Sequence, residues 1–199
     1  MYYFVTQEKN MSARKRKAVL RTIRLTQELD DVLQKDAQAK GISFNAFING
    51  LMMKYVEWDR YLNKFSFISI ASETFRSILN VVDDKELENI AKDLGSEMPK
   101  AVTMFWFKKL NLETLLNGAA LFGKYSGLHT NEIEFNEGKC IATFHHNLGE
   151  KWSTFFRHFI SQFLNSTVGI VPQTDVTSNL VVVSFRVPTV NAKGSSELM

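Results

Sequence analysis

Residues 20–58 constrain the fold of this 199-residue chain more than any other segment. The run Leu-Arg-Thr-Ile-Arg-Leu-Thr (20–26) predicts a short strand, in which successive side chains alternate between two faces. A single short strand has two unpaired edges, so it needs another strand beside it. One face of this strand would consist of Leu20, Thr22 and Arg24, and the other of Arg21, Ile23 and Leu25.

Two amphipathic helices are expected after this strand. Thr26 can cap the first helix, which Gly41 ends, and Ser43 can cap the second, which continues toward Trp58. A strand and two helices of about 40 residues bury too little apolar surface to be stable alone. We therefore expect two copies to pair antiparallel through their strands about a two-fold axis. The apolar faces of the helices would carry Leu29, Val32, Leu33 and Ala37, and Phe47, Ile48, Leu51, Met52 and Tyr55.

Positive charge is concentrated at the start of the chain. Residues 1–25 contain seven Lys and Arg against one Glu, a charge of +6, whereas the whole chain carries only +3. A basic end on a mildly acidic body is typical of a protein that binds a polyanion through that end. A solvated basic tail without a partner is the alternative interpretation of the charge alone.

Three motifs resemble the ribbon-helix-helix DNA-binding domain over residues 17–58. They are Arg-Thr-Ile-Arg-Leu-Thr-Gln-Glu-Leu (21–29), Lys-Gly-Ile-Ser (40–43) and Phe-Ile-x-x-Leu-x-x-x-Tyr (47–55). The resemblance implies a homodimer whose two-stranded ribbon enters the major groove of double-stranded DNA. An ordinary helical hairpin behind a charged leader is the alternative.

The resemblance also implies which residues contact DNA. The base contacts would come from Leu20, Thr22 and Arg24, where Arg can bond bidentately to guanine and Thr can bond or make methyl contact. Leu20 and Gly50 depart from the usual pattern, since Leu20 is apolar and Gly50 weakens a helix by about 1 kcal/mol. The phosphate contacts would come from Arg14, Lys15, Arg16, Lys17 and Arg21, and from Ser43, Phe44 and Asn45 at the N-terminus of the second helix.

The longer remainder of the chain predicts an α+β domain with helices on one face of an antiparallel sheet. Helices are expected from Ser72, from Asp83 to Gly95, over residues 100–109 after Pro99, from Asn111, and from Asn147 with Glu150 as its capping box. Strands are expected at residues 65–71, where the strand would be buried, at 131–135 and 140–146 around a turn at 137–139, and at 168–171 and 180–187. We divide the chain into a basic arm (1–18), a ribbon-helix-helix domain (19–62), an α+β domain (63–188) and a disordered tail (189–199).

Catalytic and metal-binding motifs are scarce in this sequence. A Gly-rich phosphate loop, a nucleophile elbow and a spaced cysteine pair are all missing, so we expect no enzyme and no cofactor. Four histidines and one cysteine invite a metal hypothesis, because imidazole and thiolate bind zinc, nickel or copper. Neighbouring His145 and His146 point to opposite faces of a strand, which disfavours a shared site. We therefore expect no metal site from these residues with Cys140, and we expect the four histidines to lie at the surface or to form hydrogen bonds. They are His129, His145, His146 and His158.

An aromatic stripe follows the last expected helix. Its members are Trp152, Phe156, Phe159 and Phe163, which recur at helical spacing. They can fill a core or line a pocket for a small apolar ligand, and both interpretations remain open. The order of elements is faintly similar to the small-molecule-binding domains of 4-vinyl reductases and haem NO-binding proteins, although the cysteines of many such domains are missing.

These observations predict a dimeric, sequence-specific transcription regulator, such as a repressor. Its C-terminal domain would sense a ligand or set the oligomeric state. An antitoxin-like protein with a protein partner, or an architectural DNA-binding protein, is the alternative. One cysteine, no secretory signal and no membrane-spanning apolar run place the protein in the cytoplasm, away from membranes.

Overall fold

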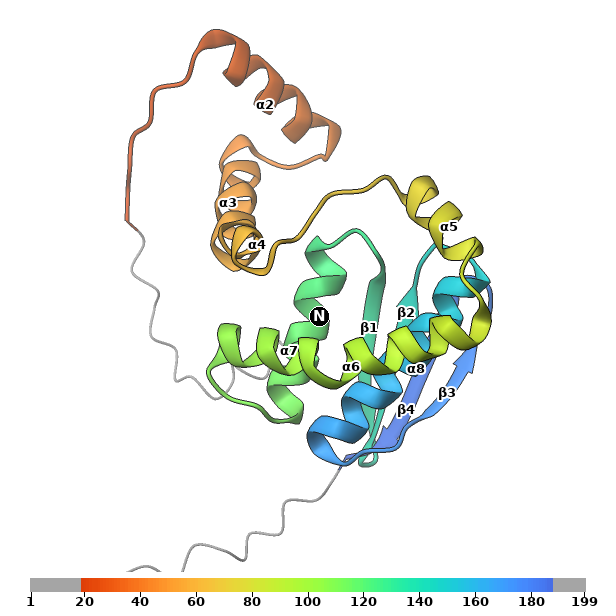
Figure 1. Ribbon diagram of the computed structural model, residues 1–199. Coiled ribbons are helices and arrows are strands. Elements are labelled where there is room, and N and C mark those ends of the chain that lie inside the picture. Colours follow the sequence, from red (N-terminus) through yellow and green to blue (C-terminus); the bar gives the residue numbers. More distant parts are fainter. Residues whose placement is uncertain (1–18, 188–199) are drawn as a thin grey trace, which may run out of the picture. The chain divides into compact units, whose positions relative to one another are not determined.

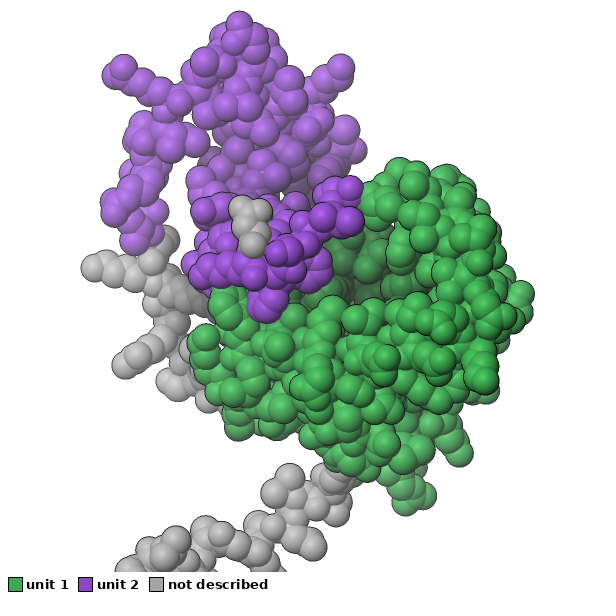
Figure 2. Space-filling model, in the orientation of Figure 1, with its two compact units in different colours: residues 1–3, 70–199 green, residues 4–69 purple. Residues whose placement is uncertain are grey.

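A computed structural model of the protein describes residues 19–187, which belong to two units (Figures 1 and 2). The described part of the N-terminal unit is residues 19–69, and that of the C-terminal unit is residues 70–187. The division thus follows Ser69, whereas the sequence predicted it after Leu62. The predicted basic arm and the predicted C-terminal tail lie outside the described residues.

In the N-terminal unit, both predicted helices form with the predicted caps. Helix α2 (Gln27–Ala39) begins after Thr26, whose hydroxyl accepts a hydrogen bond from the Leu29 N–H at 3.4 Å. Helix α3 (Phe44–Lys54) begins after Ser43, whose hydroxyl accepts from the Ala46 N–H at 3.2 Å. A π-helical turn (Tyr55–Asp59), α4 (Arg60–Leu62) and a 3-10 turn (Asn63–Phe65) follow.

Residues 19–26 are irregular and pair with no strand among the described residues. The expected partner of this segment is the same segment of a second copy, which a single chain cannot provide. The ribbon therefore stays a prediction about the dimer.

The C-terminal unit is α+β, with helices on one face of a four-stranded antiparallel sheet (Figure 1). Its helices are α5 (Ser72–Asn80), α6 (Asp84–Phe107), α7 (Leu112–Tyr125) and α8 (Glu150–Val168). Its strands are β1 (Thr130–Asn136), β2 (Lys139–His145), β3 (Gln173–Val176) and β4 (Leu180–Arg186), in the spatial order β1-β2-β4-β3. This architecture confirms the predicted fold class of the domain.

Strand alternation and a tight turn explain the sheet. Strands β1 and β2 are joined at Glu137 and Gly138, whose φ angles of +50° and +76° suit a two-residue hairpin turn. The inner face of the two central strands packs against α8 through alternate side chains. These are Cys140, Ala142 and Phe144 of β2 and Val181, Val183 and Phe185 of β4, all buried in one apolar core.

Two features, one in the C-terminal unit and one at the junction of the two units, differ from the sequence prediction. Gly95 and Pro99 do not separate two helices, because α6 runs through both of them. Gly95 instead allows a close approach, since a Cβ at this position would lie 2.5 Å from the Phe159 carbonyl oxygen of α8. The predicted strand at residues 65–71 is also wrong: this segment pairs with no strand, and Ile68 is 83% exposed.

The smaller errors concern helix ends. The predicted strand at residues 168–171 is wrong because α8 continues to Val168 and ends at left-handed Gly169, so that β3 begins only after Pro172. Gly149, not Asn147, precedes α8, and Ala71, not Ser72, precedes α5, without a side-chain cap in either case. No helix within residues 19–187 is long and apolar enough to cross a bilayer.

Candidate functional site

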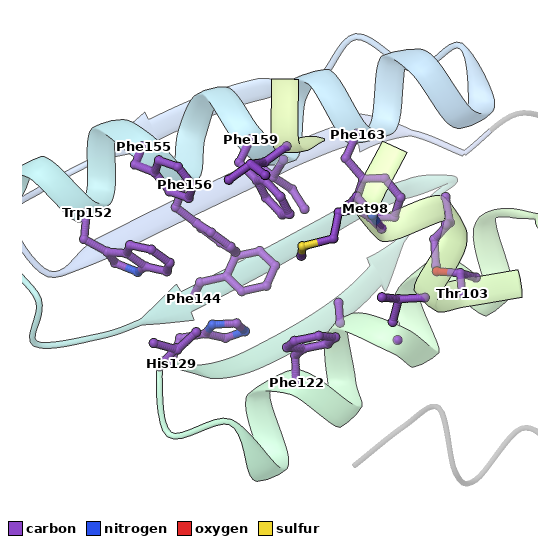
Figure 3. A pocket seen from close by; sticks show the side chains of 18 of the residues that line it. Met98, Thr103, Phe122, His129, Phe144, Trp152, Phe155, Phe156, Phe159 and Phe163 are labelled. Atoms are coloured by element: carbon purple, nitrogen blue, oxygen red, sulfur yellow. The ribbon is translucent and has the colours of Figure 1, made fainter. Parts of the chain in front are cut away.

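A cavity of about 270 Å³ lies inside the C-terminal unit (Figure 3). Helices α5, α6, α7 and α8 and strand β2 all contribute side chains to its wall, and nearly all of these are apolar. Two of them, Leu94 and Met98 on α6, are 43% and 41% exposed and mark the edge of the cavity that solvent reaches.

The aromatic stripe predicted from sequence forms one wall of this cavity. Trp152, Phe156, Phe159 and Phe163 all line it, together with Phe155 of the same helix. Their rings also pack on each other, with centroids 5.8 Å apart for Trp152 and Phe156 and 6.1 Å apart for Phe156 and Phe159. The stripe is therefore part of the core and lines a cavity at the same time.

The opposite walls come from residues that the sequence did not single out. Met98 of α6 and Phe122 of α7 lie opposite the stripe (Figure 3), while Phe144 of β2 and Phe75 of α5 line the cavity and pack on Phe156 and Trp152, with ring centroids 4.9 and 5.5 Å apart. They come from separate elements, so no local spacing connects them. Folding alone brings them together.

His129 is the ionisable side chain among the described lining residues. It is only 8% exposed, and neither of its ring nitrogens has a hydrogen-bond partner within the described chain. Its imidazole extends into the cavity, with its centroid 5.3 Å from those of the Phe144 and Phe156 rings (Figure 3). The expectation of a surface or hydrogen-bonded histidine is thus wrong for His129.

Burial, and to a lesser extent the charge of His146, together lower the pKa of His129 to about 4. The imidazole is therefore neutral at neutral pH, with one nitrogen as donor and the other as acceptor. The cavity wall accordingly contains a polar side chain without a net charge, and because both of its nitrogens are buried, a ligand reaches them only when the neighbouring rings shift.

This shift predicts how stability depends on pH. Because the folded pKa of His129 lies below the ordinary value of 6.5 for histidine, the unfolded chain binds more protons between pH 6.5 and about 4, and the folded state loses stability as the pH falls. We expect a loss of about 2–3 kcal/mol from this residue across that window. Thermal unfolding of wild type and His129→Phe at pH 6.5 and at about pH 4 isolates the contribution of His129 to stability. Equal pH dependence of the two proteins would contradict a lowered pKa for His129.

His146 and Ser153 form a pair that resembles a base and a nucleophile. The Ser153 hydroxyl lies 2.9 Å from Nε2 of His146, while the Leu148 N–H donates to Nδ1 at 3.3 Å. Since Nδ1 accepts, Nε2 carries the proton and donates to the hydroxyl, which is the wrong tautomer for a base. Ser153 is also fully buried. The pair therefore ties the loop before α8 to its first turn.

The other proposed metal ligands do not converge. Among residues 19–187, no three His, Cys, Asp or Glu side chains are grouped as a metal site would need. Burial raises the pKa of the Cys140 thiol to about 11, which disfavours the thiolate that binds metals. His145 is exposed, and His158 lies 3.8 Å from a Glu88 carboxylate oxygen.

The described residues of the predicted DNA interface lie at the surface of the N-terminal unit. Leu20 is 90% exposed, and Arg21, Thr22 and Arg24 are exposed as well. At the N-terminus of α3, Ser43 and Asn45 are exposed and Phe44 is half-buried. The other predicted phosphate contacts, Arg14, Lys15, Arg16 and Lys17, lie outside the described residues.

A broad apolar surface accompanies these residues. Among residues 19–69, Ala37, Phe47 and Trp58 are the buried hydrophobic side chains. Many others, in the segment before α2, on α2 and α3, or directly after these helices, are between 43% and 64% exposed, and we call them the N-terminal apolar surface: Val19, Ile23, Leu29, Val32, Ile42, Leu51, Met52, Met53, Tyr55 and Val56.

No family model matches this chain, and no curated protein is significantly similar to it.

Proposed function

We propose that the protein is a dimeric, sequence-specific DNA-binding transcription regulator of the cytoplasm. Its N-terminal unit would form a ribbon-helix-helix dimer, and its C-terminal unit would sense a small apolar ligand. The single observation that carries this proposal is the N-terminal apolar surface, because residues 19–69 bury only three hydrophobic side chains and leave the ten of this surface largely exposed, which is too small a core for a unit that is stable alone.

A second copy of the chain is the occupant that fits this surface best. The surface includes Ile23 of the predicted strand and Leu29 and Val32 of α2, as expected if two strands pair and bring two helix pairs together. Gly50 supports the same arrangement, since no atom of residues 19–187 lies within 4 Å of where its Cβ would be. A helix of the second copy can approach closely at this position.

Charge and exposure support DNA as the ligand of the dimer. The +6 charge of residues 1–25 adjoins the segment whose exposed face would carry Leu20, Thr22 and Arg24. Basic side chains supply affinity for phosphates, whereas side chains that reach base edges supply sequence preference. One segment of this chain offers both.

Arg24 and Arg21 provide a matched test, because they lie on opposite faces of the predicted strand. Arg24→Ala should cost about 1–3 kcal/mol on the preferred sequence and relax the sequence preference. Arg21→Ala should weaken all duplexes alike and flatten the dependence on salt. Selection from a random duplex library with the wild-type protein defines the preferred sequence. Titrations of each variant against the preferred duplex and a scrambled duplex then measure the change in affinity and the change in sequence preference.

The same titrations separate the proposal from its alternatives. An architectural protein would bind both duplexes equally, and both arginine variants would then behave alike. An antitoxin would need its second half to bind a protein partner, whereas here residues 70–187 build their own apolar core around α8 and the sheet. That core favours a self-contained sensor domain.

A further inference from the structure

The size of the cavity limits what it can hold. An apolar cavity of about 150 Å³ binds benzene, so the volume of about 270 Å³ in this protein suits a molecule of about ten to fifteen non-hydrogen atoms. Leu94 and Met98, which are half-exposed at its edge, have flexible side chains that can move aside to admit such a molecule.

The wall of the cavity limits the charge of that molecule. None of the described lining residues is an Asp, Glu, Lys or Arg, and the lining imidazole of His129 is neutral at neutral pH. A buried ion without a partner of opposite charge is strongly disfavoured. The cavity therefore excludes carboxylates and ammonium ions of otherwise suitable shape.

Two unpartnered polar groups indicate that the molecule is not a pure hydrocarbon. Both nitrogens of His129 and the indole nitrogen of Trp152 are buried at the wall without a hydrogen-bond partner within the described chain. Each such group costs free energy that a bound polar group would recover. A hydroxyl suits His129 best, because it can donate to one nitrogen of a neutral imidazole or accept from the other.

We propose that this cavity binds an uncharged, mostly apolar molecule with one hydroxyl-like group, and that His129 hydrogen-bonds this group. The inference rests on the proposed sensing role of the C-terminal unit. It adds the class of ligand and the residue that selects it.

Three probes of similar shape test the inference on the full-length protein by calorimetry at neutral pH. 2-Naphthol has about eleven non-hydrogen atoms, a size that fits the cavity, and carries a hydroxyl. Naphthalene lacks the hydroxyl, and 2-naphthoate carries a negative charge. We expect saturable binding of 2-naphthol, roughly three- to tenfold weaker binding of naphthalene, and at least roughly hundredfold weaker binding of 2-naphthoate.

Variants then assign the selectivity to one residue. His129→Phe keeps an aromatic ring in the wall and should bind 2-naphthol no better than naphthalene, whereas His129→Gln keeps a hydrogen-bonding group and should retain some preference. His145→Phe makes the same change at an exposed histidine and should behave as wild type. The ranking of the three probes on wild type needs no variant, so a variant that fails to fold does not weaken the test.

Three results would overturn the inference: no saturable binding of 2-naphthol, binding of 2-naphthoate as tight as that of 2-naphthol, or an unchanged preference in His129→Phe. Sequence-specific DNA binding is measured separately on the same protein. If DNA binding persists while the probes fail, the ligand inference falls and the DNA-binding proposal stands. If the probes bind as expected and DNA binding fails, the ligand inference stands and the DNA-binding proposal falls.

Discussion

Val32→Glu is expected to dissociate the dimer and abolish DNA binding while leaving the C-terminal unit, which has its own apolar core, folded. Val32 lies on α2 and is 56% exposed, so a glutamate at this position can be solvated in the monomer. In the proposed dimer the same carboxylate would be buried in the apolar interface without a partner. We expect the dimer to weaken by roughly 100- to 1,000-fold, measured by sedimentation equilibrium.

Gln34→Glu is the matched control for this variant. It adds the same charge to the same helix at an exposed polar position, so the dimer should keep nearly its wild-type affinity. Circular dichroism should show wild-type helix content for Gln34→Glu, whereas Val32→Glu should lose at most the signal of α2 and α3 and keep that of the helices in the C-terminal unit. A wild-type protein that sediments as a folded monomer, or a dimer that survives Val32→Glu, would remove the basis for the ribbon-helix-helix proposal.

Local signals in the sequence predicted the parts of the fold that depend on neighbouring residues. Thr26, Ser43 and Asn111 cap helices as expected because a cap involves only the first turn of its own helix. The hairpin at Glu137 and Gly138 is equally local, since the turn alone sets its register.

Signals whose meaning depends on distant elements were misleading. Gly95 and Pro99 are common at helix ends, and their spacing gave no sign that α8 lies against α6 at this point. The apolar run at residues 65–71 suggested a buried strand, yet the sheet consists of strands between Thr130 and Arg186 and offers that segment no partner.

Only part of the cavity could be predicted, because only some of its lining residues follow a local pattern in the sequence. Trp152, Phe156 and Phe159 share a helical face, and helical spacing can be seen in a sequence. His129 could not be identified in this way, because its burial depends on Phe144 of β2 and Phe156 of α8, which are distant in the chain. A histidine preceding a strand carries no local sign of its environment.

Two helix-interior glycines of the C-terminal unit should respond oppositely to the same substitution. Each Gly→Ala change gains about 1 kcal/mol of helix propensity. At Gly118 in α7, the nearest atoms to the new Cβ are 3.8 Å away, an ordinary contact, so Gly118→Ala should stabilise the unit by about 0.5–1 kcal/mol.

Gly95→Ala should instead destabilise the unit by about 3–4 kcal/mol, because its Cβ would lie 2.5 Å from a backbone oxygen of α8 that cannot rotate away. Helices α6 and α8 cannot separate freely to relieve this contact. The Gln162 amide of α8 donates to the Ser96 hydroxyl of α6 at 2.9 Å, and Lys151 of α8 binds Asp84 near the other end of α6. Urea unfolding of both variants measures the difference. A stabilised Gly95→Ala would mean that the two helices lie farther apart than described, and the cavity wall formed by Phe159 would move with them.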